Sequence, residues 1–162
     1  LPYALHEPEI WQFSLIQAIG EQGLHAYVRQ AIEQRRKEKE YPFIVYDKQT
    51  KRYVGSTRFY DIQFSQQNTQ LGYTWYGKEA QGTGLNQEVK QLLLQFAFQD
   101  MHMERVEFRA DARNQRSIAA LKKIGCTMEG TLRSNGICAD GTRRDSIICS
   151  ILRTEWQERQ HF

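Results

Sequence analysis

The sequence predicts a single α+β domain that spans residues 1–162 and is built on a mixed β-sheet. Three observations support this fold class. A chain of 162 residues is long enough for one domain with a sizeable core. The predicted elements run helix, helix, strand, strand, strand, helix, strand, helix, strand, strand, which is not a regular βαβ alternation. No internal repeat, low-complexity tract or interdomain linker divides the sequence.

Two helices are predicted in the first forty residues. A short one over Glu9–Ile19 would place Ile10 and Phe13 on one side. A clearer helix follows, because apolar residues recur at helical spacing and would form its buried face: Leu24, Tyr27, Val28, Ala31 and Ile32. The charged run at 35–40 carries both signs, which is typical of a solvated last turn and not of a basic binding surface.

The middle of the chain predicts strands. Phe43–Tyr46 and Tyr53–Tyr60 form a hairpin around the polar residues 47–51. A third strand is predicted over Thr69–Tyr76, after a polar loop. Further along, Val106–Ala110 alternates apolar and polar residues, which is the pattern of a half-buried strand.

Two more helices have clear boundaries. The strongest helical pattern in the chain runs from Leu85 to Phe98, with its apolar residues on one face. Asn114 stands where an N-cap belongs, and Gly125 lies just past the end of the apolar pattern that follows. The second helix is therefore expected between these two residues.

The C-terminal part predicts two closing strands, Thr127–Arg133 and Ser146–Leu152. Turns are expected between them at Asn135-Gly136 and at Asp140-Gly141, because these residue pairs favour turns. A short helix around Trp156 ends the chain.

Composition excludes several function classes. The net charge of +3, from 22 Lys+Arg against 19 Asp+Glu, is too small and too dispersed for a nucleic-acid platform. No apolar run approaches the roughly 18 residues that a membrane span needs, and no signal-peptide pattern opens the chain. The four histidines show no metal-ligand spacing, so no metal site is expected. Three widely spaced cysteines fit a reducing compartment, and we expect a cytoplasmic protein.

The turn before the helix at Leu85 carries the most informative residues. The first N–H groups of a helix lack intrahelical partners and carry partial positive charge, and glycines let a ligand approach that backbone closely. The turn therefore predicts a site for a phosphate or diphosphate. The alternative is that its glycines only redirect the chain. The residues concerned are Gln81, Gly82, Thr83, Gly84, Leu85 and Asn86.

This turn resembles the acyl-CoA signature of the Gcn5-related N-acetyltransferase (GNAT) family: Gln or Arg, two residues, Gly, one residue, then Gly or Ala. Gln81, Gly84 and Asn86 occupy those places, and Asn86 departs from the small final residue. The stretch Asn114–Cys126 is similar to the family's Asn-x-x-Ser/Ala segment and the helix after it. Shorter matches to the RimJ/RimL branch of ribosomal-protein acetyltransferases lie at Val54–Thr57, Leu71–Trp75, Glu129–Arg133 and Glu155-Trp156.

The resemblance covers about residues 42–156 and implies the GNAT fold. That fold has a mixed, mostly antiparallel sheet with a splayed strand pair and helices on both faces. The family's usual first strand would lie before Leu1 or be absent. The resemblance also implies acetyl-CoA as cosubstrate, no metal, a primary amine as acceptor, and a homodimer.

The resemblance further implies how acetyl-CoA is held. Backbone amides of Gln81 to Asn86 would bind its diphosphate. The strand edge at Thr74, Trp75 and Tyr76 would pair with the amides of the pantetheine arm, and Asn114 would bond the arm from the other side. The alternatives are that Trp75 and Tyr76 are core aromatics and that Asn114 is a helix cap only.

Catalytic roles are less clear, because two positions depart from the family. A Tyr that often acts as acid is replaced by Leu121, and a Glu that often acts as base is replaced by Gln70. Ser117 could stabilise the leaving sulfur, or be an ordinary first-turn residue. Glu107 and Asp111 share the polar face of their strand, and either could relay a proton or be a solvated or paired carboxylate.

The sequence thus favours direct acetyl transfer to a primary amine, either a protein N-terminus or a small amine such as a polyamine or aminoglycoside. Acceptor specificity is expected in the loops Gly20–Arg29, Ile62–Asn68 and Asn135–Arg143. One rival is a catalytically impaired CoA-binding sensor or partner module. A nucleotide-binding domain is disfavoured, because the turn lacks the third glycine of a dinucleotide fingerprint and the Gly-Lys-Ser/Thr of a P-loop.

Overall fold

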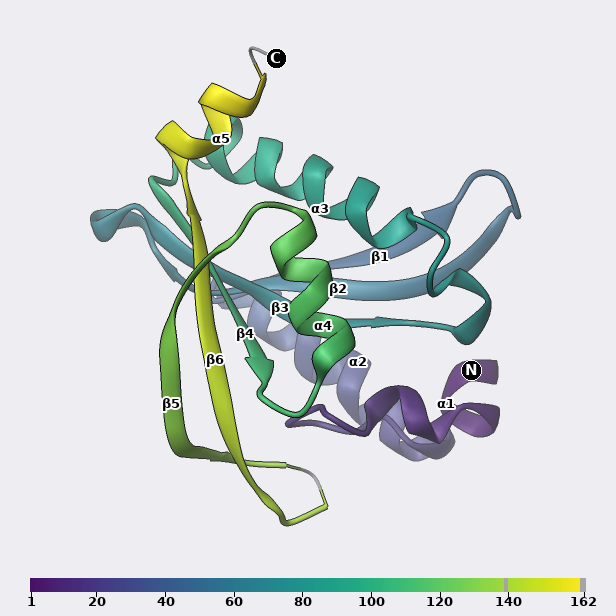
Figure 1. Cartoon of the computed structure of the whole chain (residues 1–162). Helices are drawn as coiled ribbons and strands as arrows, with labels where there is room; N and C mark the ends of the chain where they lie inside the picture. Colours follow the sequence, from purple (N-terminus) through teal and green to yellow (C-terminus); the bar gives the residue numbers. More distant parts are fainter. Residues whose placement is uncertain (139, 161–162) are drawn as a thin grey trace.

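The computed structural model describes residues 1–138 and 140–160, which form one six-stranded sheet in the order β1-β2-β3-β4-β6-β5 (Figure 1). Neighbouring strands are antiparallel except β3 and β4, which are parallel. The mixed, mostly antiparallel sheet of an α+β protein is therefore confirmed. The strands are β1 Tyr41–Asp47, β2 Arg52–Gln63, β3 Asn68–Tyr76, β4 Arg105–Asp111, β5 Thr127–Ile137 and β6 Arg143–Leu152.

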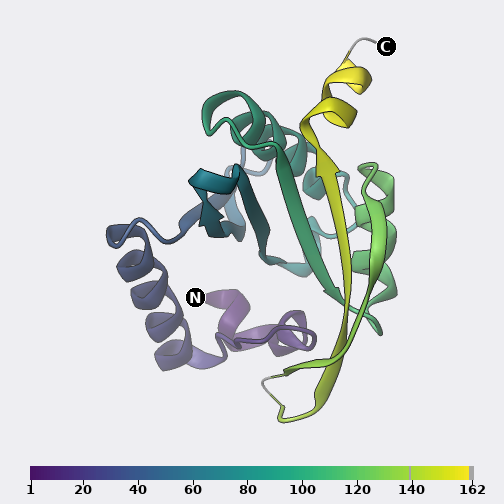
Figure 2. The ribbon, with the colours of Figure 1, turned by 90° about the vertical axis from the view of Figure 1, so that its left-hand side faces the viewer.

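Helices cover both faces of the sheet. The helices α3 and α4 lie on one face, and α2 with the N-terminal segment lies on the other (Figures 1 and 2). None of the described helices combines the length and apolar character that a membrane crossing needs. The helices are α1 Pro2–His6, α2 Gly20–Arg36, α3 Leu85–Gln95, α4 Gln115–Lys123 and α5 Arg153–Gln160, with single helical turns at Pro8–Trp11, Phe64–Gln66, Lys78–Ala80 and Phe96–Asp100.

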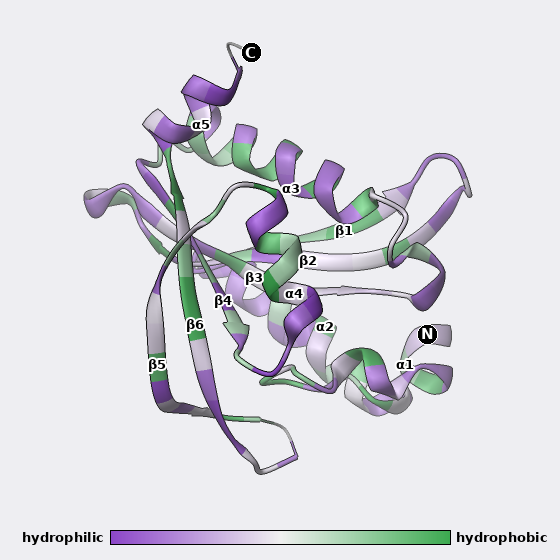
Figure 3. Ribbon diagram, viewed as in Figure 1, coloured by the Kyte–Doolittle hydropathy of each residue, from purple (hydrophilic) through white to green (hydrophobic). Residues whose placement is uncertain are grey.

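The main core lies between the sheet and the α3/α4 layer. Phe98 of the turn after α3, Phe108 of β4 and Ile151 of β6 are all at most 2 % exposed. In Figure 3 the apolar colouring runs along the middle of β6. A smaller cluster on the opposite face packs Trp11 and Tyr27 against Trp75. The two clusters therefore pack against opposite faces of β3.

The helix predicted over Glu9–Ile19 is wrong. The structure has α1 and one short turn at Pro8–Trp11, and the chain then runs irregularly to α2. Trp11 is buried against the rings of Tyr27 and Trp75, with ring centroids 5.7 and 5.0 Å away. This tertiary contact fixes the segment, because a short helix without a wide apolar face has little stability of its own.

The buried face of α2 is narrower than predicted. Tyr27 and Ala31 are buried, whereas Val28 and Ile32 are 44 % and 48 % exposed. The helix touches the sheet along one stripe only, and Figure 2 shows it standing at the edge of the molecule. The range Gly20–Arg29, predicted as an acceptor loop, belongs to this helix.

The closing hairpin is longer than predicted. Asn135 and Gly136 lie inside β5, with Gly136 paired to Arg144, so they form no turn. The chain reverses near Gly141, whose φ is +83°, at the other predicted turn, Asp140-Gly141. Residue 139, inside the predicted acceptor loop Asn135–Arg143, lies outside the described residues.

Candidate functional site

The strands β3 and β4 pair only at their first residues and then diverge. Three pairs join them, Asn68–Arg105, Thr69–Val106 and Gln70–Glu107. Beyond these pairs, β4 stays paired with β6 as far as Asp111, while β3 stays paired with β2 alone. The edge of β3 from Leu71 to Tyr76 is therefore open toward β4, as the splayed strand pair predicts (Figure 1).

A β-bulge distorts β3 beside this open edge. One β2 residue, Thr57, lies opposite two β3 residues, Tyr73 and Thr74. Tyr73 has a φ of +50°, which is unusual for a residue with a large side chain. The Thr57 hydroxyl holds the bulge, since Oγ1 donates to the Gly72 carbonyl at 3.2 Å and lies 2.8 Å from Thr74 Oγ1. The family resemblance includes Val54–Thr57 but gives Thr57 no role.

The backbone at the end of β3 faces the gap, whereas its aromatic side chains do not. The Gly77 N–H donates to the Val54 carbonyl of β2 at 2.9 Å. Because successive residues of a strand face opposite sides, Tyr76 presents its backbone away from β2. Its carbonyl there accepts a hydrogen bond from Gln81 Nε2 at 2.9 Å.

The side chains of Trp75 and Tyr76 are core aromatics. Trp75 packs against Trp11 and Tyr3 on the face that the N-terminal segment covers. Tyr76 is buried under α3 beside Val54, and burial raises the pKa of its hydroxyl. Tyr76 therefore offers a ligand its backbone and not its ring, whereas the backbone of Trp75 faces Ser56 of β2.

The helix α3 begins without a cap. Its N-cap residue is Gly84, with a φ of +92°, and no side chain bonds the first turn from this position. The N–H groups of Gly82, Thr83, Gly84 and Asn86 donate no hydrogen bond to any described residue. The Leu85 N–H has only a long contact, 3.4 Å to Thr83 Oγ1. Four main-chain donors are thus free at one helix start.

Space is also free at this turn. A Cβ built on Gly82 or Gly84 would meet nothing within 4 Å. The Gln81 N–H, in contrast, already donates to the Lys78 carbonyl at 3.1 Å. The set of available amides therefore begins at Gly82, one residue later than the sequence predicts.

The helix α4 begins on the other side of the gap with a conventional cap. Asn114 Oδ1 accepts the Ser117 N–H at 3.0 Å. The Asn114 amide nitrogen and the Ser117 hydroxyl bond no described residue. The cap that the sequence allowed for Asn114 is present, and its Nδ2 donors are still available to a ligand.

A groove of about 390 Å³ lies between the turn that precedes α3 and the first turn of α4. Lys78 and Gln81 line it from the β3 side, and Asn114 and Arg116 line it from the α4 side. Four residues of the N-terminal segment also line it, Glu9, Ile10, Gln12 and Phe13, and the Lys78 ammonium is paired with Glu9. The groove therefore lies at the mouth of the β3–β4 gap.

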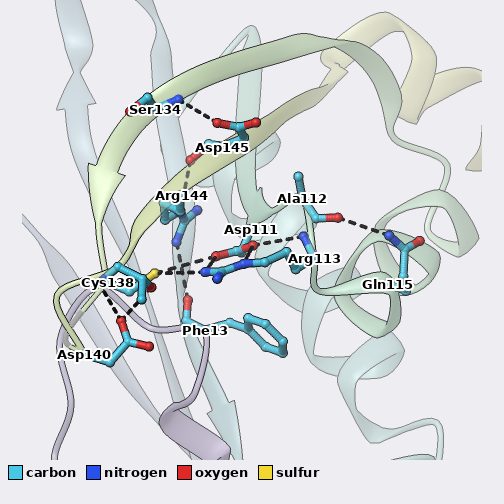
Figure 4. Close-up of polar contacts among 12 residues, drawn as sticks. Phe13, Asp111, Ala112, Arg113, Gln115, Ser134, Cys138, Asp140, Arg144 and Asp145 are labelled. Atoms are coloured by element: carbon cyan, nitrogen blue, oxygen red, sulfur yellow. Dashed lines mark hydrogen bonds and ion pairs between the residues drawn. The ribbon is translucent and has the colours of Figure 1, made fainter.

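The carboxylate of Asp111 is committed to its neighbours (Figure 4). The Arg113 guanidinium donates to both of its oxygens, at 3.0 and 2.8 Å, and the Cys138 thiol donates at 3.6 Å. Hydrogen bonding by Arg113 lowers the pKa of the buried Asp111 to about 2. A carboxylate with so low a pKa is a weak base at neutral pH.

Glu107 is also paired. It accepts hydrogen bonds from Arg105 at 3.0 Å and from Arg109 at 2.8 Å. It lies opposite Gln70 in the paired part of β3 and β4, before the strands diverge. The structure therefore gives both predicted carboxylates ion-pair partners, whereas Asn114 lines the groove beside the gap.

Comparisons with known proteins agree with this architecture. The sequence profile described as "Acetyltransferase (GNAT) domain" matches residues 1–127. The chain is 28% identical over 103 residues to the "Putative ribosomal N-acetyltransferase YdaF" of Bacillus subtilis (strain 168), and the match covers 64% of this chain but only 55% of that protein. It is 27% identical over 148 residues to the "Probable N-acetyltransferase YjcK" of the same organism, covering 89% and 81%.

Solved structures show the same fold. The crystal structure of a "putative acetyltransferase" from T. thermophilus superposes with a TM-score of 0.84 at 29% identity, over 96% of this chain and 81% of that one. A mutant of the spermidine N-acetyltransferase SpeG from Vibrio cholerae superposes with a TM-score of 0.75 at 17% identity, over 88% and 82%. At that identity the second match shows the fold alone.

Proposed function

The chain belongs to the GNAT acetyltransferase family, and on that premise we propose that it transfers the acetyl group of acetyl-CoA to the amine of a protein N-terminus. One observation carries the proposal. The free N–H groups at the start of α3 lie beside the open edge of β3. A long anionic thioester needs both features, a diphosphate site and a strand edge for its arm.

The residues present fit acetyl-CoA. The amides of Gly82, Thr83, Gly84 and Asn86, with the helix dipole of α3, would hold the diphosphate. The open backbone from Thr74 to Tyr76 would pair with the amides of the pantetheine arm, as a peptide pairs with a sheet edge. Asn114 Nδ2 would donate to the arm from the α4 side.

The reaction forms a C–N bond between the amine and the thioester carbon and breaks the C–S bond. The backbone N–H groups of the two bulge residues, Tyr73 and Thr74, are our candidate donors to the oxyanion that forms on the carbonyl oxygen. The Ser117 hydroxyl, which has no described partner, is our candidate donor to the leaving sulfur. Water accepts the proton of the amine, because Asp111 and Glu107 are both ion-paired.

The acceptor would approach from the face opposite α3. The rings of Tyr60 and Tyr73 lie 5.0 Å apart on that face, which leaves the α3 side of the gap to the cosubstrate. Support for a protein N-terminus comes from the relative described as a ribosomal N-acetyltransferase. We infer that the substrate is the N-terminal segment of a ribosomal protein.

An acetylation assay tests this proposal. The protein is incubated with acetyl-CoA and, in separate reactions, with peptides that carry ribosomal-protein N-termini, with spermidine and with an aminoglycoside. We expect thiol release with a peptide, and mass spectrometry should place one acetyl group on its α-amine. Thiol release with a small amine alone would contradict the acceptor class. CoA binding without thiol release on any acceptor would contradict catalysis and favour a sensor.

A further inference from the structure

Arg116 bridges the mouth of the groove between the two helix starts. Its Nη1 donates to Oε1 of Gln81, and Gln81 Nε2 donates in turn to the Tyr76 carbonyl at 2.9 Å. A chain of two hydrogen bonds thus runs from the end of β3 to the first turn of α4. Gln81 immediately precedes the free amides of Gly82 to Asn86.

The charge of Arg116 has no counterpart among the described residues. Arg105, Arg109 and Arg113 each bond a carboxylate, whereas the bond from Arg116 goes to a neutral amide. No acidic residue lies in the first turn of α4. A cation at a helix N-terminus also lies at the positive end of the helix dipole. This placement disfavours the free protein and favours a bound anion.

We propose that Arg116 binds the diphosphate of the cosubstrate, leaving Gln81 when acetyl-CoA enters the groove. The guanidinium fork matches the geometry of phosphate oxygens better than that of a single amide oxygen. The amides of Gly82 to Asn86 hold the diphosphate from the α3 side, and Arg116 holds it from the α4 side. The inference rests on the proposed use of acetyl-CoA and adds a residue to which the family resemblance described above gives no role.

The test compares Arg116→Gln with Lys123→Gln. Glutamine keeps a donor for Gln81 but removes the charge, and Lys123 is an exposed cation at the other end of the same helix. Calorimetry gives the Kd of each protein for CoA and for dephospho-CoA, which keeps the diphosphate. Turnover with S-acetylpantetheine, which has no phosphate, gives kcat/KM with the acceptor found above.

We expect Arg116→Gln to weaken the binding of both CoA and dephospho-CoA by about tenfold, because one charge-assisted contact at an exposed site is lost. Its kcat/KM with S-acetylpantetheine should equal that of the wild type, because this substrate has no phosphate, and its thermal midpoint should not fall. Lys123→Gln should change neither Kd by more than about twofold, the range of an ordinary surface substitution.

Three results would overturn the inference. The first is an unchanged Kd for CoA. The second is weaker binding of CoA but not of dephospho-CoA, which would place the contact at the 3′-phosphate. The third is an equal loss of kcat/KM with S-acetylpantetheine. Failure of the wild type to bind CoA would instead overturn the proposed function. The two failures are therefore distinguishable.

Discussion

Two helices begin beside the β3–β4 gap, and they begin in different ways. The helix α4 is capped by Asn114, which satisfies the Ser117 N–H at 3.0 Å. The helix α3 starts at Gly84 with no side-chain cap and with open space around its glycines. Both follow a strand of the same parallel pair and both carry a helix dipole. The difference is that the protein satisfies an N–H group of the first turn of α4 with its own side chain, and leaves those at the start of α3 without such a cap.

The largest effect is expected from adding a side chain at the uncapped start. Gly84→Ala places a Cβ in the open space at a φ of +92° and displaces the amides that would meet the diphosphate. We expect the affinity for CoA to fall by on the order of thirtyfold, the loss of one charge-assisted hydrogen bond of about 2 kcal/mol. Calorimetric titration with CoA measures the change.

The matched control is Gly20→Ala, at a φ of +70° with no atom within 4 Å of the added Cβ. Both substitutions should cost about 1–2 kcal/mol of stability, because both force alanine into the left-handed region. Only the substitution at Gly84 should weaken the binding of CoA. Equal CoA affinity in the two variants would show that the uncapped start of α3 does not bind CoA.

The bulge lies on β3 and not at a helix start, so a substitution there should change the catalytic rate and not the binding of the cosubstrate. Thr57→Val removes the hydroxyl that holds Gly72 and Thr74. We expect kcat to fall by about tenfold, corresponding to about 1.4 kcal/mol of transition-state stabilisation, while the KM for acetyl-CoA stays constant. Thr57→Ser should keep most of the rate. A rise in KM with unchanged kcat would assign Thr57 to cosubstrate binding instead.

A smaller effect is expected at the capped start. Asn114→Asp keeps the cap oxygen but removes the Nδ2 donors, so we expect the KM for acetyl-CoA to rise by about fivefold, or about 1 kcal/mol for one hydrogen bond. Asn114→Ala should in addition lower the free energy of unfolding by about 1 kcal/mol through loss of the cap. Steady-state kinetics and chemical denaturation measure the two quantities. Normal kinetics in Asn114→Asp would leave Asn114 with the cap alone.

The smallest effect on the reaction is expected on the buried side of α3. Lys90 lies there over the Phe108 ring, 5.0 Å from its centroid, and burial lowers its pKa from 10.5 to about 8. Below pH 8 the lysine is protonated in the folded and unfolded states, so the full cost of burying its charge is present. As pH rises from 8 toward 10.5, the folded form is neutral while the unfolded form still binds the proton, and stability increases.

Lys90→Met should therefore stabilise the protein by about 2–3 kcal/mol at pH 7, and the gain should shrink toward pH 10. CoA affinity should be unchanged, since the substitution leaves the open start of α3 as it is. Urea denaturation at several pH values measures the gain. A gain that is constant with pH would show that the charge of Lys90 is not its source.

Local signals made much of the fold predictable from the sequence. The cap at Asn114 and the helix start at Leu85 follow from residue types and spacing within a few positions. Glu107 lies two residues from Arg105 and from Arg109 on one strand face, so its pairing was among the readings that the sequence left open. These features depend on residues that are close together in the sequence, so the sequence alone can predict them.

The remaining features depend on contacts between distant residues. The bulge at Tyr73 is held from β2 by Thr57, which is 16 residues earlier in the chain. The thiol on Asp111 comes from Cys138, 27 residues later. The N-terminal segment takes its path from the burial of Trp11 against Tyr27 and Trp75. Such contacts exist only once the chain has folded, and no spacing rule predicts them.

The most direct measurement is a titration of the ¹⁵N-labelled protein with CoA, followed by ¹⁵N–¹H correlation spectra. We expect the amide signals of Gly82, Thr83, Gly84 and Asn86 to shift most, because these four N–H groups have no partner among the described residues. The Ser117 amide, already bonded to Asn114, should shift less. Saturable CoA binding that leaves the four signals in place would contradict the proposal that these N–H groups bind the diphosphate.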